Sequence, residues 1–177
     1  MLDELWGPPV AVTAAHEGRA NGLISTTAIA ASLFAETPRV LVALAKANLT
    51  HDLVLASGAF AVHLLPPDAL DLVRALGMRS GRDGDKLAGF GWRPGATGSP
   101  ILARAVGYAE ARIASTFDAG ELTIVVGDVV AEGRTGGAFL TTALLAETMP
   151  PEMREEWEAR REQEQAAAAK MRGPAAR

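Results

Sequence analysis

Short, β-rich apolar segments separated by turns fill most of this sequence, and no other feature limits its fold as strongly. Arg39–Ala45 (RVLVALA) and residues 60–65 (FAVHLL) have the length and continuous apolar character of buried strands. Asp118-Ala119-Gly120 separates two longer runs and predicts a hairpin turn. The helical segments between the strands are too short and too few for a doubly wound parallel sheet. The remaining predicted strands are residues 10–14, 21–27, 105–116 and 121–132.

Two short helices fit between these strands. Residues 50–57 have Thr50 as an expected N-cap and Gly58 as a stop signal. Residues 67–76 begin with a proline, which the first turn of a helix tolerates, and carry leucine and valine on one face. These elements together predict a mainly β fold with α insertions, of the antiparallel barrel type.

The composition changes once, near Thr148, where the apolar body gives way to a segment dense in Glu, Arg, Gln and Ala. We therefore divide the chain into a domain of residues 1–147 and a C-terminal helical arm of residues 148–177. Within the arm, residues 152–171 are acidic at the start and basic at the end, as the helix dipole favours. We also expect an ion pair between Glu156 and Arg160, four positions apart.

Met149, Met153 and Trp157 are spaced by four and give the arm a short apolar stripe. One interpretation is that the helix folds back onto its own domain. The other is that it packs on a partner subunit. We favour the second, because the stripe is short and the rest of the helix is polar on all sides.

Charge and residue usage exclude several classes of protein. The chain has 17 Lys and Arg against 21 Asp and Glu, so a broad basic surface for nucleic acid is not expected. It has no cysteine, which removes disulfides, thiolate nucleophiles and iron–sulfur clusters. Its three histidines, His16, His51 and His63, are far apart in sequence, and we expect no metal site. Any redox chemistry must therefore come from an organic cofactor.

The sequence also lacks the marks of a membrane or secreted protein. No run approaches the eighteen or so apolar residues that a membrane span requires. The N-terminus carries Asp3 and Glu4 and has no basic segment of the kind that opens a secretory signal. We expect a soluble, cytoplasmic protein with no membrane partner.

The segment from Lys46 to Asp52 (KANLTHD) offers chemistry for binding a phosphate. A buried strand ends at Ala45, and the cation of Lys46, the amide of Asn48 and the hydroxyl of Thr50 follow around Ala47 as a helix begins. A positive charge, side-chain donors and helix N-terminal N–H groups at one point suit a phosphate group. The alternative is an ordinary strand–helix corner with an exposed lysine, and on chemistry alone this alternative is the better supported.

A second polar segment runs from Asn21 to Ala28. Ser25, Thr26 and Thr27 are consecutive hydroxyl residues at the end of a predicted strand, where they could hydrogen-bond the edge of a flat heteroaromatic ring. Ala28 and the small residues after it leave room for such a ring. The alternative is a polar edge strand.

The order of the motifs resembles that of the flavin reductase-like family of FMN-binding split-barrel proteins, over about residues 9–133. Each motif is weak alone, but their shared order and compatible spacing make a strong joint signal. The motifs are Val12-Thr13, Asn21-Gly22, Glu36-Thr37-Pro38, Lys46-x-Asn48-x-Thr50-His51, Gly58-x-Phe60-x-Val62, Ser80-Gly81-Arg82-Asp83 with Asp85-Lys86, residues 98–102 (GSPIL) and Gly127-Asp128-Val129.

This resemblance implies a Greek-key split barrel and a homodimer with FMN near the subunit interface. It implies that residues 25–28 border the isoalloxazine, and that residues 46–50 hold the ribityl phosphate. It makes His63 a candidate flavin neighbour, with a hydrogen-bonded core histidine as the alternative. Arg82 and Lys86 are candidates for added charge near the phosphate, with solvated loop positions as the alternative.

The function implied is transfer of hydride from NADH or NADPH to flavin, with an oxygenase component as a candidate partner. One departure bears on this activity: Leu122 stands where many relatives have a histidine beside the flavin or nicotinamide. An FMN-binding redox carrier without nicotinamide-dependent activity is therefore the alternative. A barrel that holds a deazaflavin or haem is a third interpretation. No catalytic residue is assigned.

Overall fold

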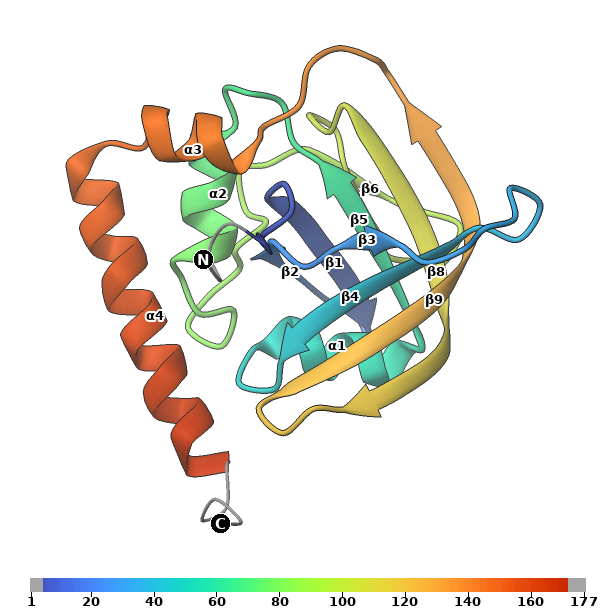
Figure 1. The fold of residues 1–177 in the computed structure, drawn as a ribbon, viewed down its shortest axis with the longest axis horizontal. Coiled ribbons are helices and arrows are strands. Elements are labelled where there is room, and N and C mark those ends of the chain that lie inside the picture. Colours follow the sequence, from blue (N-terminus) through green and yellow to red (C-terminus); the bar gives the residue numbers. More distant parts are fainter. Residues whose placement is uncertain (1–4, 172–177) are drawn as a thin grey trace.

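The computed structural model describes residues 5–171, the side chain of Met171 excepted, and shows a curled sheet with the C-terminal helices along one side of it (Figure 1). The acidic residues 3 and 4 and the last six positions of the arm lie outside this range. The strands are β1 (Val10–His16), β2 (Arg19–Ser25), β3 (Ile29–Ala30), β4 (Arg39–Ala45), β5 (Ala59–Leu64), β6 (Trp92–Pro94), β7 (Pro100–Leu102), β8 (Gly107–Asp118) and β9 (Leu122–Arg134), and the helices are α1 (Leu49–Ser57), α2 (Leu70–Gly77), α3 (Thr142–Thr148) and α4 (Pro151–Met171).

Seven strands form one antiparallel sheet in the order β2-β1-β5-β8-β9-β4-β3. The two edge strands, β2 and β3, are consecutive in the sequence and are joined by residues 26–28 alone. Three residues can link the two edges of such a sheet only if the sheet curls until its edges meet. The Thr27 hydroxyl bridges the closure, because it lies 3.3 Å from both the oxygen and the nitrogen of Ala43 on β4. We call residues 25–28 together with Ala43 the seam.

Local signals account for the connections between these elements. Gly120, in the predicted hairpin between β8 and β9, has a φ of 84° that favours glycine. Gly58 ends α1 with a φ of 66°, as predicted. The prediction of a mainly β fold with α insertions and a C-terminal helix is confirmed.

Apolar side chains form two clusters, and β1 contributes to both because successive strand residues point to opposite faces. The first cluster includes Val12 and draws on six of the strands, so it fills the barrel, and α1 packs into it through Leu53 and Val54. The second cluster includes Ala11 and lies beneath α2, α3 and the start of α4.

The C-terminal arm packs on its own domain. Met153 is buried in the second cluster, and Met149 and Trp157 pack against that cluster. The interpretation that we favoured, an arm packed on a partner subunit, is therefore wrong for the apolar stripe. The expected pair within the arm is also wrong, because Glu156 pairs with Arg74 on α2, and Arg160 pairs with Glu164.

Within residues 5–171, none of the helices is both long enough and apolar enough to cross a membrane.

Candidate functional site

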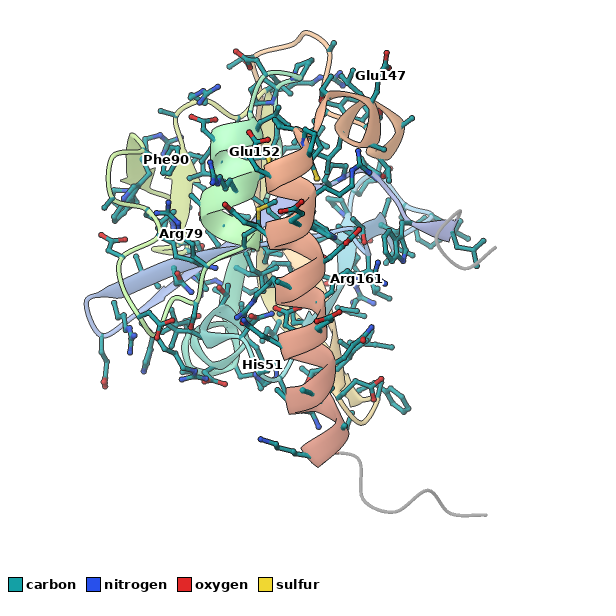
Figure 2. All side chains as sticks on the ribbon, turned by 90° about the vertical axis from the view of Figure 1, so that its left-hand side faces the viewer. His51, Arg79, Phe90, Glu147, Glu152 and Arg161 are labelled. Atoms are coloured by element: carbon teal, nitrogen blue, oxygen red, sulfur yellow. The ribbon has the colours of Figure 1, made fainter. Side chains whose placement is uncertain are left out.

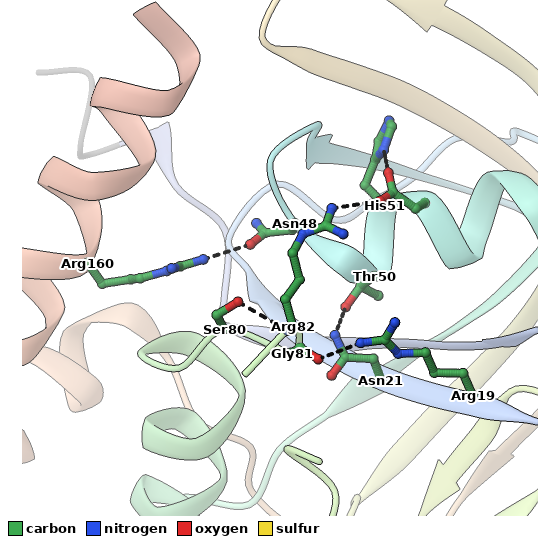
Figure 3. Close-up of polar contacts among 10 residues, drawn as sticks. Arg19, Asn21, Asn48, Thr50, His51, Ser80, Gly81, Arg82 and Arg160 are labelled. Carbon is green, nitrogen blue, oxygen red and sulfur yellow. Dashed lines mark hydrogen bonds and ion pairs between the residues drawn. The ribbon is translucent and has the colours of Figure 1, made fainter. Parts of the chain in front are cut away.

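Polar side chains from β2, α1, the loop after α2 and α4 converge at the start of α1 (Figure 3). Asn48 is the N-cap residue of α1, but its side chain makes no cap hydrogen bond. Its side-chain oxygen accepts a bond of 3.0 Å from Nη2 of Arg160 instead. The N–H groups of the first turn of α1 therefore have no side-chain cap, and such groups attract anions.

Thr50 lies in the first turn of α1 and is not its N-cap, which corrects our expectation. The Thr50 side chain is fully buried, and its hydroxyl accepts a hydrogen bond of 3.1 Å from Nδ2 of Asn21 on β2. Asn21 in turn lies against Gly81, whose carbonyl accepts a bond from Arg19. The structure thus brings Asn21, from the segment that we assigned to the ring edge, together with Asn48 and Thr50, from the segment that we assigned to the phosphate. We call the set Asn21, Asn48, Thr50, Ser80, Gly81, Arg82 and Arg160 the polar corner.

Arg82 belongs to the polar corner through a chain of charged and polar contacts. Its guanidinium pairs with Asp52 at 2.7 Å, and Asp52 also contacts Nδ1 of His51 at 3.1 Å. Partial burial pushes the pKa of Asp52 upward, but the hydrogen bonds to His51 and Arg82 outweigh burial and lower the pKa. His51 Nε2 lies 2.9 Å from the Thr123 hydroxyl on β9. The chain of contacts holds Arg82 at the corner and ties α1 to the sheet.

The predicted row of hydroxyls lies at the seam. The Ser25 and Thr27 hydroxyls are 3.0 Å apart, and the Thr26 carbonyl accepts a bond from the Gly7 backbone. Ser25 is buried, whereas Thr26 and Ala28 are half-buried and Thr27 is exposed. These residues therefore carry hydroxyl and backbone groups of the kind that can hydrogen-bond the edge of a flat ring.

Lys46 does not join the polar corner. Its ammonium pairs with Asp118 in the hairpin turn at 2.7 Å, and this pairing lowers the pKa of Asp118. Ala47 lines a cavity of about 220 Å³ together with Ala45 and Leu122. Leu122 therefore lines the same cavity as the end of β4. A hydrogen-bonding side chain at position 122 would be available to a ligand in that cavity.

Lys86 is buried, so the alternative of a solvated loop position is wrong for it. Its ammonium donates to the carbonyls of Leu76 at 2.6 Å and Arg79 at 3.2 Å, so it caps the C-terminal end of α2. Burial lowers its pKa to about 8, and the positive charge of Arg160 contributes to the shift.

His63 lies away from the polar corner. It is fully buried, its Nδ1 contacts the Ala11 carbonyl at 3.2 Å, and its ring lies near that of Tyr108. Burial lowers its pKa to about 4. The structure therefore matches the alternative of a core histidine, and it does not bring His63 to the other predicted site residues.

Sequence reasoning missed Arg160 and Arg19. The expected i,i+4 partner of Arg160 was Glu156, and no local pattern connects residue 160 with residue 48. Arg19 precedes the Asn21-Gly22 motif by two positions on β2, where strand alternation places it on the same face as Asn21. That alternation is the signal that could have found it.

The donors at the polar corner fit a phosphate group. They comprise uncapped helix N–H groups, a hydroxyl, an amide and two guanidinium groups, and the acids Asp52 and Glu164 already have arginine partners. Phosphate oxygens are best held by this combination of charged and backbone donors. The fold is therefore a small β-barrel with donors for an anionic group at one point and hydroxyls for a flat ring along its seam.

Comparison with known proteins identifies the family. The sequence model described as "Flavin reductase like domain" matches residues 3–145, and the chain belongs to this family. The resemblance drawn from the motifs is confirmed.

Individual relatives agree with this assignment. The chain is 32% identical to the ferric-chelate reductase (NAD(P)H) of Archaeoglobus fulgidus over 67% of this chain and 70% of the relative. It is 33% identical to the high molecular weight rubredoxin of Moorella thermoacetica over 67% of this chain and 52% of the relative, so it spans about half the length of that protein. Its fold matches an FMN-binding protein from Thermus thermophilus with a TM-score of 0.67 and 30% identity, over 73% of this chain and 71% of that structure.

Proposed function

We propose that this protein is an FMN-dependent oxidoreductase that transfers hydride from NADH or NADPH to flavin. The observation that carries the proposal is the polar corner, where an uncapped helix start, Thr50 and Arg82 offer donors to a phosphate. The seam begins at Ser25, on the same strand β2 as Asn21, and offers hydroxyls to a ring. Membership of the flavin reductase-like family and the similarity to an FMN-binding protein support this choice of ligand.

The residues of this chain would act mainly by binding and orienting. Asn48, Thr50 and Arg82 would hold the phosphate, and the Ser25 and Thr27 hydroxyls would hydrogen-bond the ring edge. Bound FMN supplies a ring nitrogen that accepts hydride. Because hydride transfer requires stacked rings and no dedicated acid or base, the barrel contributes mostly position.

Anaerobic spectroscopy tests the proposal. Purified protein is mixed with FMN and then with NADH or NADPH, and the visible flavin band is followed. The proposal predicts that FMN binds and that at least one nicotinamide bleaches the band. Absence of bleaching with both nicotinamides contradicts the reductase function.

A second candidate function is an FMN-binding redox carrier, and Leu122 favours it. The described residues that line the cavity beside Leu122 include no histidine, and its polar side chains come from Glu121 and, on α4, from Arg161, Glu164 and Gln165. Under this candidate FMN co-purifies and neither nicotinamide reacts. Leu122→His would then raise the rate of bleaching, whereas under the first candidate the wild-type rate is already substantial.

We also propose a homodimer with the flavin near the interface. Leu33 is 99% exposed and Phe34 is 69% exposed, in the loop between β3 and β4. Large apolar side chains gathered on one exposed loop are typical of a protein–protein contact. Light scattering of the wild type and of Leu33→Asp tests this: a dimer that becomes a monomer supports it, and a monomeric wild type contradicts it.

An oxygenase component is the partner that we propose to receive reduced flavin. One relative is the reductase subunit HsaB of a flavin-dependent monooxygenase from Mycobacterium tuberculosis, of which this chain spans 60%. A coupled assay with an FMN-dependent monooxygenase as acceptor tests this role, since product formation must require both proteins.

A further inference from the structure

Helix α4 lies along one side of the domain, beside α2 and then across the start of α1 (Figure 1, Figure 2). Its first turns are anchored by buried Met153 and by the ion pair between Glu156 and Arg74. Trp157 follows and lies against Gly77 at the end of α2. This docking fixes where the next turn of α4 meets the domain.

That next turn places Arg160 at the polar corner. Its side chain is only 17% exposed, although arginine is usually a surface residue. Nη2 donates to Asn48 and Nε donates to Glu164 at 3.1 Å. A guanidinium has five N–H donors, and no described residue accepts from Nη1. Arg160 thus retains donors for a further ligand.

The surroundings of Arg160 contain both cations and acids. It lines a cavity of about 420 Å³ together with Ser80, Lys86 and the carboxylates Asp83 and Asp85. Burial lowers the pKa of Lys86 to about 8, and Arg160 is close enough for its positive charge to contribute to that shift. Arg82, on the same loop as Ser80, adds a third cation to the corner. Arg82 and Arg160 already pair with Asp52 and Glu164, so what the corner offers an anion is the Nη1 donor of Arg160, free among the described residues, and not an excess of positive charge.

We propose that Arg160 is a phosphate-binding residue of the flavin site, supplied by a helix outside the family domain. The proposal rests on the proposed function, since it assigns a further ligand to the same site. The family match ends at residue 145, and α4 begins after it, at Pro151. Arg160 would hold the N-cap side chain of α1 with Nη2 and the phosphate oxygen with Nη1. The packing of the apolar stripe on the domain would then fix the position of Arg160.

Binding measurements with two flavins separate this role from simple packing. FMN and riboflavin differ only in the phosphate, and their affinities for the apoprotein are measured by titration calorimetry. Arg160→Gln should weaken FMN binding by about tenfold or more, as loss of a charge-assisted hydrogen bond predicts, and leave riboflavin binding unchanged. Arg160→Lys should recover part of the loss because it keeps the charge.

Two variants on α4 serve as matched controls. Arg154→Gln removes an exposed guanidinium that donates to the Ala146 carbonyl, six positions from Arg160. Glu156→Gln weakens the ion pair to Arg74 and so loosens the docking of α4 without touching the corner. Both should retain the wild-type ratio of FMN to riboflavin affinity.

Three results would overturn the inference. Arg160→Gln binding FMN as tightly as the wild type would show that it makes no phosphate contact. An equal loss of affinity for FMN and for riboflavin would show that Arg160 acts only by fixing the position of the helix. Tighter FMN binding by Arg160→Gln would show that α4 competes with the phosphate. A wild type that binds neither flavin would instead refute the proposed function, and the inference with it.

Discussion

Gly81 packs so closely against Asn21 that a β-carbon on Gly81 would lie 2.2 Å from the Asn21 side-chain nitrogen. That nitrogen is the donor to the Thr50 hydroxyl. The backbone of the loop after α2 therefore packs against the Asn21 side chain on β2. This contact holds the Asn21 side chain toward the first turn of α1. Any side chain at position 81 must displace Asn21 or move the loop.

Gly81→Ala should accordingly weaken FMN binding by about tenfold, because the methyl group breaks the contact between Asn21 and Thr50 and shifts the donors of the polar corner. Gly84→Ala is the matched control in the same loop, since a β-carbon there meets nothing within 4 Å. Titration of both variants with FMN checks the prediction. Equal affinities in the two variants would mean that the loop yields without disturbing the corner.

Thr50→Val should lower the free energy of unfolding by about 1–2 kcal/mol. Valine keeps the volume of the side chain, but the buried Asn21 amide loses its acceptor. Urea unfolding measures the loss, and Thr135→Val, which alters an exposed hydroxyl, should change the stability by a few tenths of a kcal/mol. A double-mutant cycle with Asn21→Leu should be non-additive, because both substitutions remove one interaction.

Met153→Ala should destabilise the protein by about 2–4 kcal/mol, because the side chain is buried in the cluster beneath α2 and α3. Glu155→Ala, on the exposed face of the same helix, should have little effect. Thermal unfolding at several protein concentrations checks this. A Met153→Ala effect that shrinks with dilution would contradict this packing, because dilution removes only those contacts that the stripe makes with a partner subunit.

The sequence was sufficient to predict those helices, strands and turns whose signals are local. The hairpin at Asp118–Gly120 follows from one turn, and α1 ends at Gly58 because glycine adopts a positive φ easily. The elements β3, β6, β7 and α3 are seven residues or fewer and carry no periodic pattern, so they were not predicted. Their positions depend on pairing with distant strands, which a local pattern cannot encode.

The residues of the polar corner also divide into those that a local motif predicts and those that it does not. Asn48 and Thr50 lie in one motif beside a strand end and were predicted, whereas Arg160 reaches Asn48 across 112 positions. Lys86 was predicted as a charge near the phosphate or as a solvated loop residue, and neither prediction anticipated its burial, which lets it donate to the carbonyls that end α2. This burial is visible only once the loop is seen to fold back beneath the helix.

His63 gives a prediction of pH dependence. Its Nδ1 lies 3.2 Å from the Ala11 carbonyl, which can only accept, so the neutral ring carries its proton on Nδ1. Nε2 is buried and has no hydrogen-bond partner among the described residues. Protonating Nε2 in the folded protein would place a charge in the core, and the Ala11 and Pro100 carbonyls and the Glu110 carboxylate offset that cost only in part. This cost is why burial lowers the pKa from 6.5 to about 4.

The stability of the protein should therefore fall as the pH drops from about 6.5 to about 4. In that window the unfolded chain binds a proton at His63 and the folded chain does not, so acid favours unfolding; above about 6.5 both states are neutral and the contribution is constant. The shift corresponds to roughly 3 kcal/mol at its full extent. His63→Asn keeps an amide donor near the position of Nδ1 but cannot titrate, so the difference in unfolding free energy between wild type and variant should shrink across this window. Urea unfolding at pH 7.5, 6, 5 and 4.5 (about one unit apart on average) measures it, and a difference that stays constant with pH would show that the folded protein accepts the proton as readily as the unfolded chain.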